Sequence, residues 1–217
     1  MEKDTILILS GGMDSVTMLY EYQERIALAL SFDYGSNHNH RELPFARLHC
    51  QRLGIDHITI PLAFMQQHFQ SSLLSGDASI PEGEYAEGNM LSTVVPFRNG
   101  IMLSIAVGMA ESRGLKHVMM ANHGGDHSLY PDCRPEFVSA FSAAAQAGTY
   151  EAVTLEAPYT NLTKADIARH GRHLGVDYSL TWSCYRGGER HCGRCATCIE
   201  RHEALVAAGI SDPTLYE

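Results

Sequence analysis

A short apolar run that leads into two adjacent glycines constrains the fold of this chain more than any other feature. Thr5–Leu9 has the composition of a buried strand, the segment Ser10–Ser15 reads Ser-Gly-Gly-Met-Asp-Ser, and Val16–Tyr22 has helical spacing. Adjacent glycines let successive N–H groups face one anion, and the N-terminus of the next helix adds partial positive charge. The pattern therefore predicts a phosphate-binding turn. The alternative is a serine- or aspartate-capped turn without a ligand.

Strands and helices alternate along most of the chain. This alternation predicts an α/β fold with a doubly wound, mainly parallel sheet. Residues 163–166 read Thr-Lys-Ala-Asp, a capping box with Asp in place of Glu, and so predict the start of the last of these helices. The predicted strands cover residues 5–9, 27–32, 56–60, 116–121 and 153–156, and the predicted helices cover residues 16–22, 41–53, 99–113, 135–147 and 164–174.

Composition and charge exclude several classes of protein. The 217 residues are 45% apolar, which is enough for a buried core and excludes a disordered chain. Sixteen Lys and Arg against 25 Asp and Glu give a net charge of −9, the wrong sign for a nucleic-acid partner. No targeting segment follows Met1, and no apolar run approaches the roughly 20 residues of a membrane span. We expect a soluble, cytoplasmic protein.

Two stretches interrupt the alternation. Residues 71–95 are rich in Gly, Ser, Glu and Pro and predict a mobile loop or lid. Near Asp177 a cysteine-bearing tail begins. We therefore expect an α/β domain over residues 1–176 and a tail over residues 177–217, with a C-terminal helix packed on it.

The tail carries four of the six cysteines, Cys184, Cys192, Cys195 and Cys198. Their spacing is short enough for one tetrahedral ion, and four thiolates leave no open coordination position, which is typical of a structural site. An iron–sulfur cluster, disulfides and unliganded thiols are the alternatives. Ligand type, spacing and a reducing compartment favour Zn²⁺. Nearby arginines, among them Arg186 and Arg201, predict either a solvated loop or a positive surface for an anion.

The glycine turn resembles the PP-loop of the N-type ATP pyrophosphatases, which cleave ATP to AMP and pyrophosphate in order to adenylate a substrate oxygen. This resemblance covers at least the first half of the chain. It implies an adenine-nucleotide hydrolase-like fold, ATP as substrate and Mg²⁺ held with the pyrophosphate. The residues implied to line the ATP phosphates are Leu9, Ser10, Gly11, Gly12, Met13, Asp14, Ser15, Val16, Thr17, Met18 and Leu19.

Further strings resemble one branch of that superfamily, the 7-cyano-7-deazaguanine synthases of queuosine precursor biosynthesis. Together with the glycine turn, they extend the resemblance to nearly the whole chain. The strings are Phe-Asp-Tyr-Gly at 32–35, Val-Pro-Phe-Arg-Asn at 95–99, Tyr-Pro-Asp-Cys-Arg at 130–134, Ser-Cys-Tyr at 183–185 and Cys-Gly-Arg-Cys-Ala-Thr-Cys at 192–198.

The family resemblance implies a carbon–nitrogen ligase that converts 7-carboxy-7-deazaguanine and ammonia to the nitrile 7-cyano-7-deazaguanine. ATP would activate the carboxylate as an acyl adenylate, ammonia would displace AMP to give an amide, and a second adenylation would allow loss of AMP and formation of the nitrile. The resemblance also implies structural Zn²⁺ and a homodimer. No glutaminase segment is present, so free ammonium is the simpler nitrogen source.

Individual roles follow from the matched strings. We expect Ser10, Asp14 and Ser15 to hold the pyrophosphate and its Mg²⁺. Arg98 can reach a phosphate or the substrate carboxylate, or can be a helix-end arginine. Asp132 can read the guanine-like edge of the base or serve as a turn residue. The predicted catalytic residues are Ser10, Asp14, Ser15, Arg98 and Asp132, and the predicted substrate residues are Tyr34, Arg98, Tyr130, Asp132 and Arg134.

Three places differ from the family pattern at the expected pocket rim. Phe97 stands where a glycine is usual, residues 36–40 read Ser-Asn-His-Asn-His, and residues 122–129 read Asn-His-Gly-Gly-Asp-His-Ser-Leu. In the last segment, His123 and His127 predict either a second metal or proton-shuttle site, or two solvated side chains.

Other functions remain open at this point. The first is a tRNA-modifying PP-loop ligase, against which the net charge of −9 argues. The second is a relative that stops at the amide. The third, which is not an enzyme, is a zinc-stapled nucleotide-sensing module that binds ATP without releasing pyrophosphate.

Overall fold

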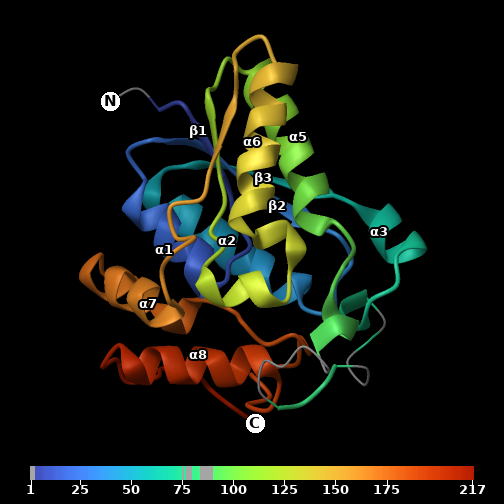
Figure 1. Cartoon of the computed structure of the whole chain (residues 1–217). Coiled ribbons are helices and arrows are strands. Elements are labelled where there is room, and N and C mark those ends of the chain that lie inside the picture. The colour runs from blue at the N-terminus through green and yellow to red at the C-terminus, as the bar shows by residue number, and fades with distance from the viewer. Residues whose placement is uncertain (1–2, 75, 77–79, 84–89) are drawn as a thin grey trace.

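A five-stranded sheet forms the centre of the computed structural model, which describes residues 3–74, 76, 80–83 and 90–217 (Figure 1). Every strand pairing in it is parallel, and the order is β3-β2-β1-β4-β5. The winding direction reverses beside the first strand, where doubly wound sheets bind ligands. The strands are β1 (Thr5–Ile8), β2 (Ile26–Asp33), β3 (Asp56–Pro61), β4 (His117–Met119) and β5 (Thr154–Glu156).

Helices cover both faces of the sheet. The α-helices are α1 (Met13–Glu21), α2 (Asn39–Leu53), α3 (Ala63–His68), α5 (Arg98–Ser112), α6 (Pro135–Gly148), α7 (Lys164–His173) and α8 (Ala196–Ala207). Short 3₁₀ turns lie at Ser72–Leu74, Leu91–Thr93, Gly124–Ser128, Pro131–Cys133 and Tyr178–Leu180.

Alternate residues of the central strands pack on opposite layers. On one face, Ile6 and Leu28 join the core that includes Leu103 of α5. On the other face, Leu7 and Ala29 join the core beneath α1, α2 and α7. Because both faces are covered, the strands read as continuous apolar runs rather than as an alternating pattern.

The predicted α/β fold is confirmed. All five strands and all five helices of the predicted alternation are present, with ends that differ from the prediction by a few residues. The capping box at Thr163 and Asp166 is formed, with each side chain accepting a hydrogen bond from the other residue's backbone N–H. The short α3 was not predicted. The predicted lid lies partly outside the described residues. Within its described part, Gly83 N–H donates to the carbonyl of Arg194 in the tail.

By length and composition alone, the stretch Leu91–Ser112, which contains α5, could cross a membrane. Here α5 is a core helix, because Leu103 and Ala106 are fully buried against the sheet. Phe97, just before the helix, has φ +51°, a conformation that favours glycine.

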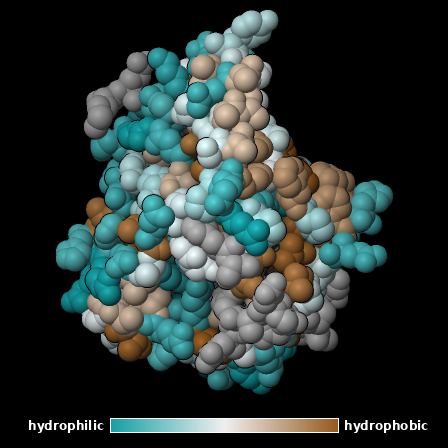
Figure 2. Space-filling model, viewed as in Figure 1, coloured by the Kyte–Doolittle hydropathy of each residue, from teal (hydrophilic) through white to brown (hydrophobic). Residues whose placement is uncertain are grey.

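The face that carries α6 is rich in small apolar side chains. Figure 2 shows tan residues along this helix, on the same side of the molecule as in Figure 1. Phe137 of α6 packs on Phe141 of the same helix and on the exposed ring of Phe97. Four of the nine exposed residues of the helix are alanines.

The tail packs against the end of the sheet that carries the glycine turn. Trp182 donates its backbone N–H to the carbonyl of Gly11 at 3.1 Å. Arg201 of α8 is fully buried and donates to Tyr178 O, Thr181 Oγ1 and Thr214 Oγ1 at 2.6–2.8 Å. The segment before α8 contains little regular structure, so side-chain bonds of this kind hold its shape.

Candidate functional site

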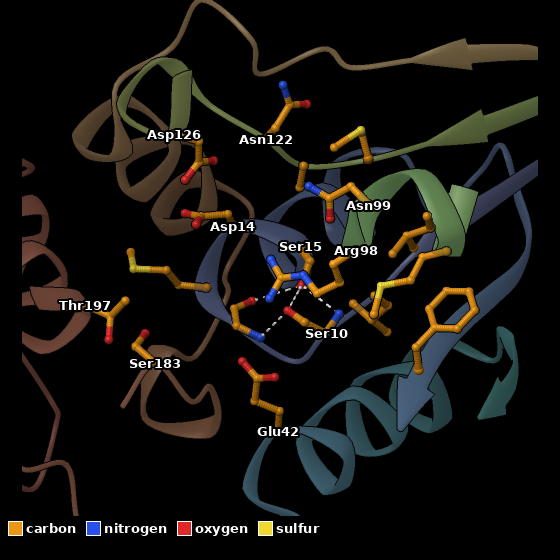
Figure 3. A pocket seen from close by; sticks show the side chains of 18 of the residues that line it. Ser10, Asp14, Ser15, Glu42, Arg98, Asn99, Asn122, Asp126, Ser183 and Thr197 are labelled. Carbon is orange, nitrogen blue, oxygen red and sulfur yellow. Dashed lines mark hydrogen bonds between the residues drawn. The ribbon is translucent and has the colours of Figure 1, made fainter. Parts of the chain in front are cut away.

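A cavity of about 240 Å³ lies at the carboxyl ends of β1 and β4. Ile8 and Leu9 at the end of β1 and Met120 and Ala121 after β4 contribute to its floor. One wall comes from the turn after β1 and from α2 and α5, and the opposite wall comes from the tail (Figure 3). This is the position at which doubly wound sheets bind ligands.

The glycine turn is held in shape by its two serines. The hydroxyls of Ser10 and Ser15 lie 3.0 Å apart, and Ser10 Oγ accepts from Gly12 N at 3.1 Å. Ser15 Oγ accepts from Ser10 N at 3.2 Å and lies 3.2 Å from the carbonyl of Gly12, to which it can donate. The loop therefore presents hydroxyls and backbone donors at the N-terminus of α1, which is a suitable cradle for phosphate oxygens.

Gly11 has a steric reason to be glycine. Its φ is +101°, and a Cβ at this position would collide with the backbone carbonyl of Glu42 in α2. The loop and the first turn of α2 thus approach each other as closely as two backbones can. A side chain here would push the phosphate loop away from α2.

A partly buried cluster of charged side chains flanks the loop. Lys164, at the start of α7, lies 3.3 Å from Asp14 Oδ2 and donates to Glu200 Oε2 of α8 at 2.7 Å. Burial alone would lower the pKa of Lys164, but the carboxylates of Asp14, Glu200 and Asp126 outweigh it and raise the pKa. The lysine therefore stays cationic. Asp14 Oδ1 is buried without a hydrogen-bond partner, so this oxygen can still coordinate a cation.

His123 stands behind this cluster and is 2% exposed. Its Nδ1 accepts from Gly125 N, and its Nε2 faces the carboxylates of Asp14, Asp126 and Glu200 at 3.8–3.9 Å. His123 thus caps the 3₁₀ turn that carries Asp126. The side chain of His127 lies outside the described part of the chain, so the pairing of the two histidines stays a prediction.

The other end of the cavity is aromatic and carries a second cation. Arg98 projects from the N-terminus of α5, donates to Tyr34 Oη at 3.2 Å and lies 5.6 Å from the centre of the Tyr34 ring. Tyr130 and Tyr185 complete this end, with their hydroxyls 3.2 Å apart. A planar ring with a carboxylate substituent matches this combination of aromatic walls and guanidinium.

Glu42 of α2 lines the same cavity. Its side chain extends from α2 toward the phosphate loop and the Arg98 guanidinium (Figure 3). Burial raises the pKa of Glu42 to about 8, an effect that Arg98 partly offsets. His38, one turn earlier in the chain, places Nε2 3.7 Å from Glu42 Oε2.

Asp132 and Arg134 do not line the cavity. Asp132 Oδ2 accepts the backbone N–H of Asn99 at 2.8 Å, so this carboxylate caps the N-terminus of α5. Asn99 in turn donates to Cys133 Sγ at 3.1 Å, and both of these residues face the cavity. Arg134 is exposed at the start of α6.

The four tail cysteines converge. The sulfurs of Cys184, Cys192, Cys195 and Cys198 all lie within 4.8 Å of one another, and all four side chains are buried. Those of Cys192 and Cys198 are 4.0 Å apart. A tetrahedron with zinc–sulfur bonds of about 2.3 Å has sulfurs about 3.8 Å apart, so the donor set and its spacing fit Zn²⁺. Backbone N–H groups of Arg194 and Cys195 donate to Cys192 Sγ, as is common around thiolate ligands.

The sequence profile described as "Queuosine biosynthesis protein QueC" matches residues 4–209. This chain belongs to the QueC family. It is 62% identical to the 7-cyano-7-deazaguanine synthase of Porphyromonas gingivalis over 216 residues, which cover 100% of this chain and 98% of the relative. It is 52% identical to the synthase of Desulfotalea psychrophila, with 98% of each chain covered.

A solved structure of NMN synthetase from Francisella tularensis has the same fold. The TM-score is 0.56 at 16% identity, over 97% of this chain and 79% of that one. The likeness concerns architecture alone, and it agrees with the α/β fold predicted for a QueC protein. The resemblance to the 7-cyano-7-deazaguanine synthases is confirmed by the QueC profile and the close relatives.

The structure brings together most of the site residues that the QueC-like motifs predict. Leu9, Ser10, Gly12, Met13, Asp14 and Ser15 line the cavity, as do Tyr34, Arg98 and Tyr130. Gly11 and the helical residues Val16, Thr17, Met18 and Leu19 lie behind the loop and do not line the cavity.

Sequence reasoning missed several cavity residues of this QueC chain. The position of Lys164 could have marked it as a site residue. A cation in the first turn of a helix is unfavourable beside the positive end of the helix dipole, so a lysine there indicates a role other than stabilising the helix. Glu42 gave none, because a glutamate in a first turn is ordinary. Two of the three departures from the family pattern contribute to the wall, through His38 and Asn39 after β2 and through Asn122 and Asp126 after β4.

Proposed function

We propose that this chain is a 7-cyano-7-deazaguanine synthase, a ligase that uses ATP and ammonia to convert 7-carboxy-7-deazaguanine to the nitrile. One observation carries the proposal beyond family membership. A single cavity joins a phosphate cradle at Ser10–Ser15 to an aromatic end that holds Arg98. An adenylating enzyme needs this adjacency, because the substrate carboxylate must reach the α-phosphate of ATP.

The phosphate end would bind the nucleotide. Ser10, Gly12 and Ser15 would donate to phosphate oxygens, and Lys164 would add a fixed positive charge. Asp14 would hold Mg²⁺ through the oxygen that has no hydrogen-bond partner. When bound, Mg²⁺ neutralises charge that develops on the departing pyrophosphate. Leu9 to Leu19 remain the proposed nucleotide-binding segment as a whole.

The aromatic end would bind the deazaguanine. Tyr34 and Tyr130 would pack against its ring, and Arg98 would hold the carboxylate beside the α-phosphate. Asp132, at the N-terminus of α5, would act on substrate by fixing that helix and with it Arg98. Arg134 would contribute from the exposed rim of the same loop.

The reaction would then follow from positioning. A carboxylate oxygen of the substrate attacks the α-phosphate, pyrophosphate leaves, and the acyl adenylate forms. Ammonia displaces AMP to give the amide. The amide oxygen is adenylated by a second ATP, and loss of AMP gives the nitrile. Each adenylation benefits from fixed donors around the phosphates rather than from covalent chemistry by the protein.

Several further properties belong to the same proposal. Residues 1–176 would form the ATP-binding domain, and residues 177–217 would form a tail stapled by Zn²⁺ at its four cysteines, a donor set that fits this metal. The protein would act in the cytoplasm as a homodimer, on small molecules and not on nucleic acid, in keeping with its net charge of −9.

The test is direct. Purified protein is incubated with Mg²⁺·ATP, ammonium and 7-carboxy-7-deazaguanine, and the products are identified by mass, which separates acid, amide and nitrile. We expect the nitrile together with AMP and pyrophosphate. Exchange of labelled pyrophosphate into ATP that depends on the deazaguanine acid would report the first adenylation alone. Absence of both exchange and AMP formation would overturn the proposal.

Two variants sharpen this test. Asp14→Ala and Ser10→Ala should each lower turnover by about 10²-fold or more while leaving the melting temperature nearly unchanged, because each removes a ligand contact at the cavity rather than core packing. Asp56→Ala, an exposed change on β3, is the matched control. Equal losses in the control would mean that the assay reports folding and not catalysis.

A further inference from the structure

Glu42 differs from the other carboxyl groups in the described part of the cavity wall. Asp14 pairs with Lys164, and Asp126 accepts the backbone N–H of His123. Glu42 accepts no hydrogen bond from the described residues, yet it lines the cavity and its carboxylate points toward the glycine turn (Figure 3). Its helix is pressed so closely onto the phosphate loop that Gly11 cannot carry a side chain.

Three groups face Glu42. His38 approaches from the same helix at 3.7 Å, and Arg98 and Tyr34 act on it electrostatically from α5 and from the end of β2. Burial lowers the pKa of His38 to about 3 and raises that of Tyr34, so both are neutral near pH 7. Arg98 stays cationic. Glu42 is therefore the member of this group that exchanges a proton near neutral pH, since burial raises its pKa to about 8.

The proposed reaction needs such a group. When ammonia displaces AMP, a carbon–nitrogen bond forms, a carbon–oxygen bond breaks, and nitrogen must lose one proton to leave a neutral amide. When the amide is converted to the nitrile, adenylation of its oxygen and loss of one proton from nitrogen give a neutral imidate. As this imidate collapses, a carbon–oxygen bond breaks, the carbon–nitrogen double bond becomes a triple bond, and nitrogen loses its last proton. A base beside the reacting carbon accelerates both steps, and its best pKa lies near the working pH.

We propose that Glu42 is the general base that removes these protons from nitrogen. The inference rests on the proposed function and adds a catalytic residue to it. Glu42 lines the same cavity as the phosphate cradle and Arg98, and the acyl adenylate would lie in this cavity. Asp14 is unsuited to the task because Lys164 and the proposed Mg²⁺ occupy it.

The experiment compares Glu42→Gln with wild type on separate partial reactions. Pyrophosphate exchange measures adenylation, which needs no proton from nitrogen, and quenching of Trp182, the single tryptophan and a cavity residue, measures binding of ATP and of the acid. We expect exchange and both dissociation constants to stay within about threefold, while nitrile formation falls about 10²- to 10³-fold. Glu203→Gln, an exposed change on α8, is the matched control.

Two further measurements are independent of that variant. The wild-type log kcat/KM, expressed per free NH3 so that the titration of ammonium is removed, should rise with pH and level off above about pH 8. Glu42→Gln should lose this pH dependence. Glu42→Ala should regain part of its activity, at least about tenfold, when formate is added, because a small carboxylate can enter the space left by the side chain.

The possible failures are distinguishable. If Glu42→Gln weakens acid binding and exchange as much as it lowers turnover, the residue recognises the base and the proposal is wrong. If turnover is unchanged, or if formate gives no rescue and the pH limb persists, it is also wrong. Absence of acid-dependent exchange in wild type would instead contradict the proposed function itself.

Discussion

The two walls of the cavity are built in different ways. The sheet wall, formed by the glycine turn with α2 and α5, takes its shape from strand pairing and from backbone contacts such as that between Gly11 and Glu42. The tail wall contains Trp182, Ser183, Tyr185 and Thr197, and side-chain bonds hold it.

This difference predicts different responses to mutation. A single substitution in the sheet wall removes few of the backbone hydrogen bonds that hold it. The tail, in contrast, depends on a few side chains that each hold several segments together. Arg201 alone joins three separate segments, and the four cysteines meet at one point. Substitutions in the sheet wall should therefore reduce activity at nearly constant stability. Substitutions of Arg201 or of the four cysteines in the tail should reduce stability first.

The largest expected effect comes from removing one ligand of the four-cysteine site in the tail. Cys195→Ser should abolish metal binding and lower the free energy of unfolding by several kcal/mol, because structural zinc sites contribute about 10 kcal/mol or more to the folding of small domains. Metal analysis and thermal unfolding of the purified protein measure both quantities. Cys50→Ala, at a buried cysteine away from the cluster, should keep the metal and lose only about 1–2 kcal/mol. Retention of metal by Cys195→Ser would contradict the four-thiolate site.

A smaller effect, on the binding of Mg²⁺·ATP, should show that the tail wall influences the phosphate loop of the sheet wall. Glu200 of the tail holds Lys164, which in turn contacts Asp14 of the phosphate loop. In Glu200→Gln the lysine loses one of its anionic partners and should pair more fully with Asp14, in competition with the cation of Mg²⁺·ATP. We expect KM for Mg²⁺·ATP to rise about tenfold, equivalent to about 1.4 kcal/mol, with kcat changed much less. Unchanged kinetics relative to Glu203→Gln would show that the walls are independent.

The last effect concerns acid and belongs to the sheet wall. Burial lowers the pKa of His38 to about 3 from an ordinary value of about 6.5, so the unfolded chain takes up this proton more readily than the folded one. The contribution to stability is therefore complete above about pH 6.5 and declines by about 1.4 kcal/mol per pH unit as the pH falls toward 3. His38→Gln should remove this share of the pH dependence of the melting temperature between pH 6.5 and 5. An identical slope in the variant would contradict it.

Much of the fold followed from local patterns. Buried parallel strands are continuous apolar runs, and the glycine turn and the Thr163–Asp166 box mark helix starts by their own chemistry. The cysteine cluster was equally readable, because ligand spacing is a local property. The short α3 (Ala63–His68) was not predicted, because one and a half turns give too few residues for a periodic signal.

The missed site residues share one cause. Glu42, Lys164 and Tyr185 lie on three elements far apart in the chain, and only the packing of those elements brings them to one cavity. Asp132 shows the converse, since its motif predicted a contact with the base while its carboxylate caps α5. Local sequence shows which polar residues lie in loops, but not the direction in which the folded loop points their side chains.

The chain order of the two walls sets the time at which the site can exist during synthesis. A chain is made from its N-terminus, and its domains generally fold in that order. The phosphate loop at Ser10–Ser15 is therefore synthesised well before Cys198 and Glu200. A nascent or prematurely terminated chain would carry the sheet and the loop without the opposite wall. Ligase activity would thus begin only after the cysteine cluster and Glu200 have been synthesised.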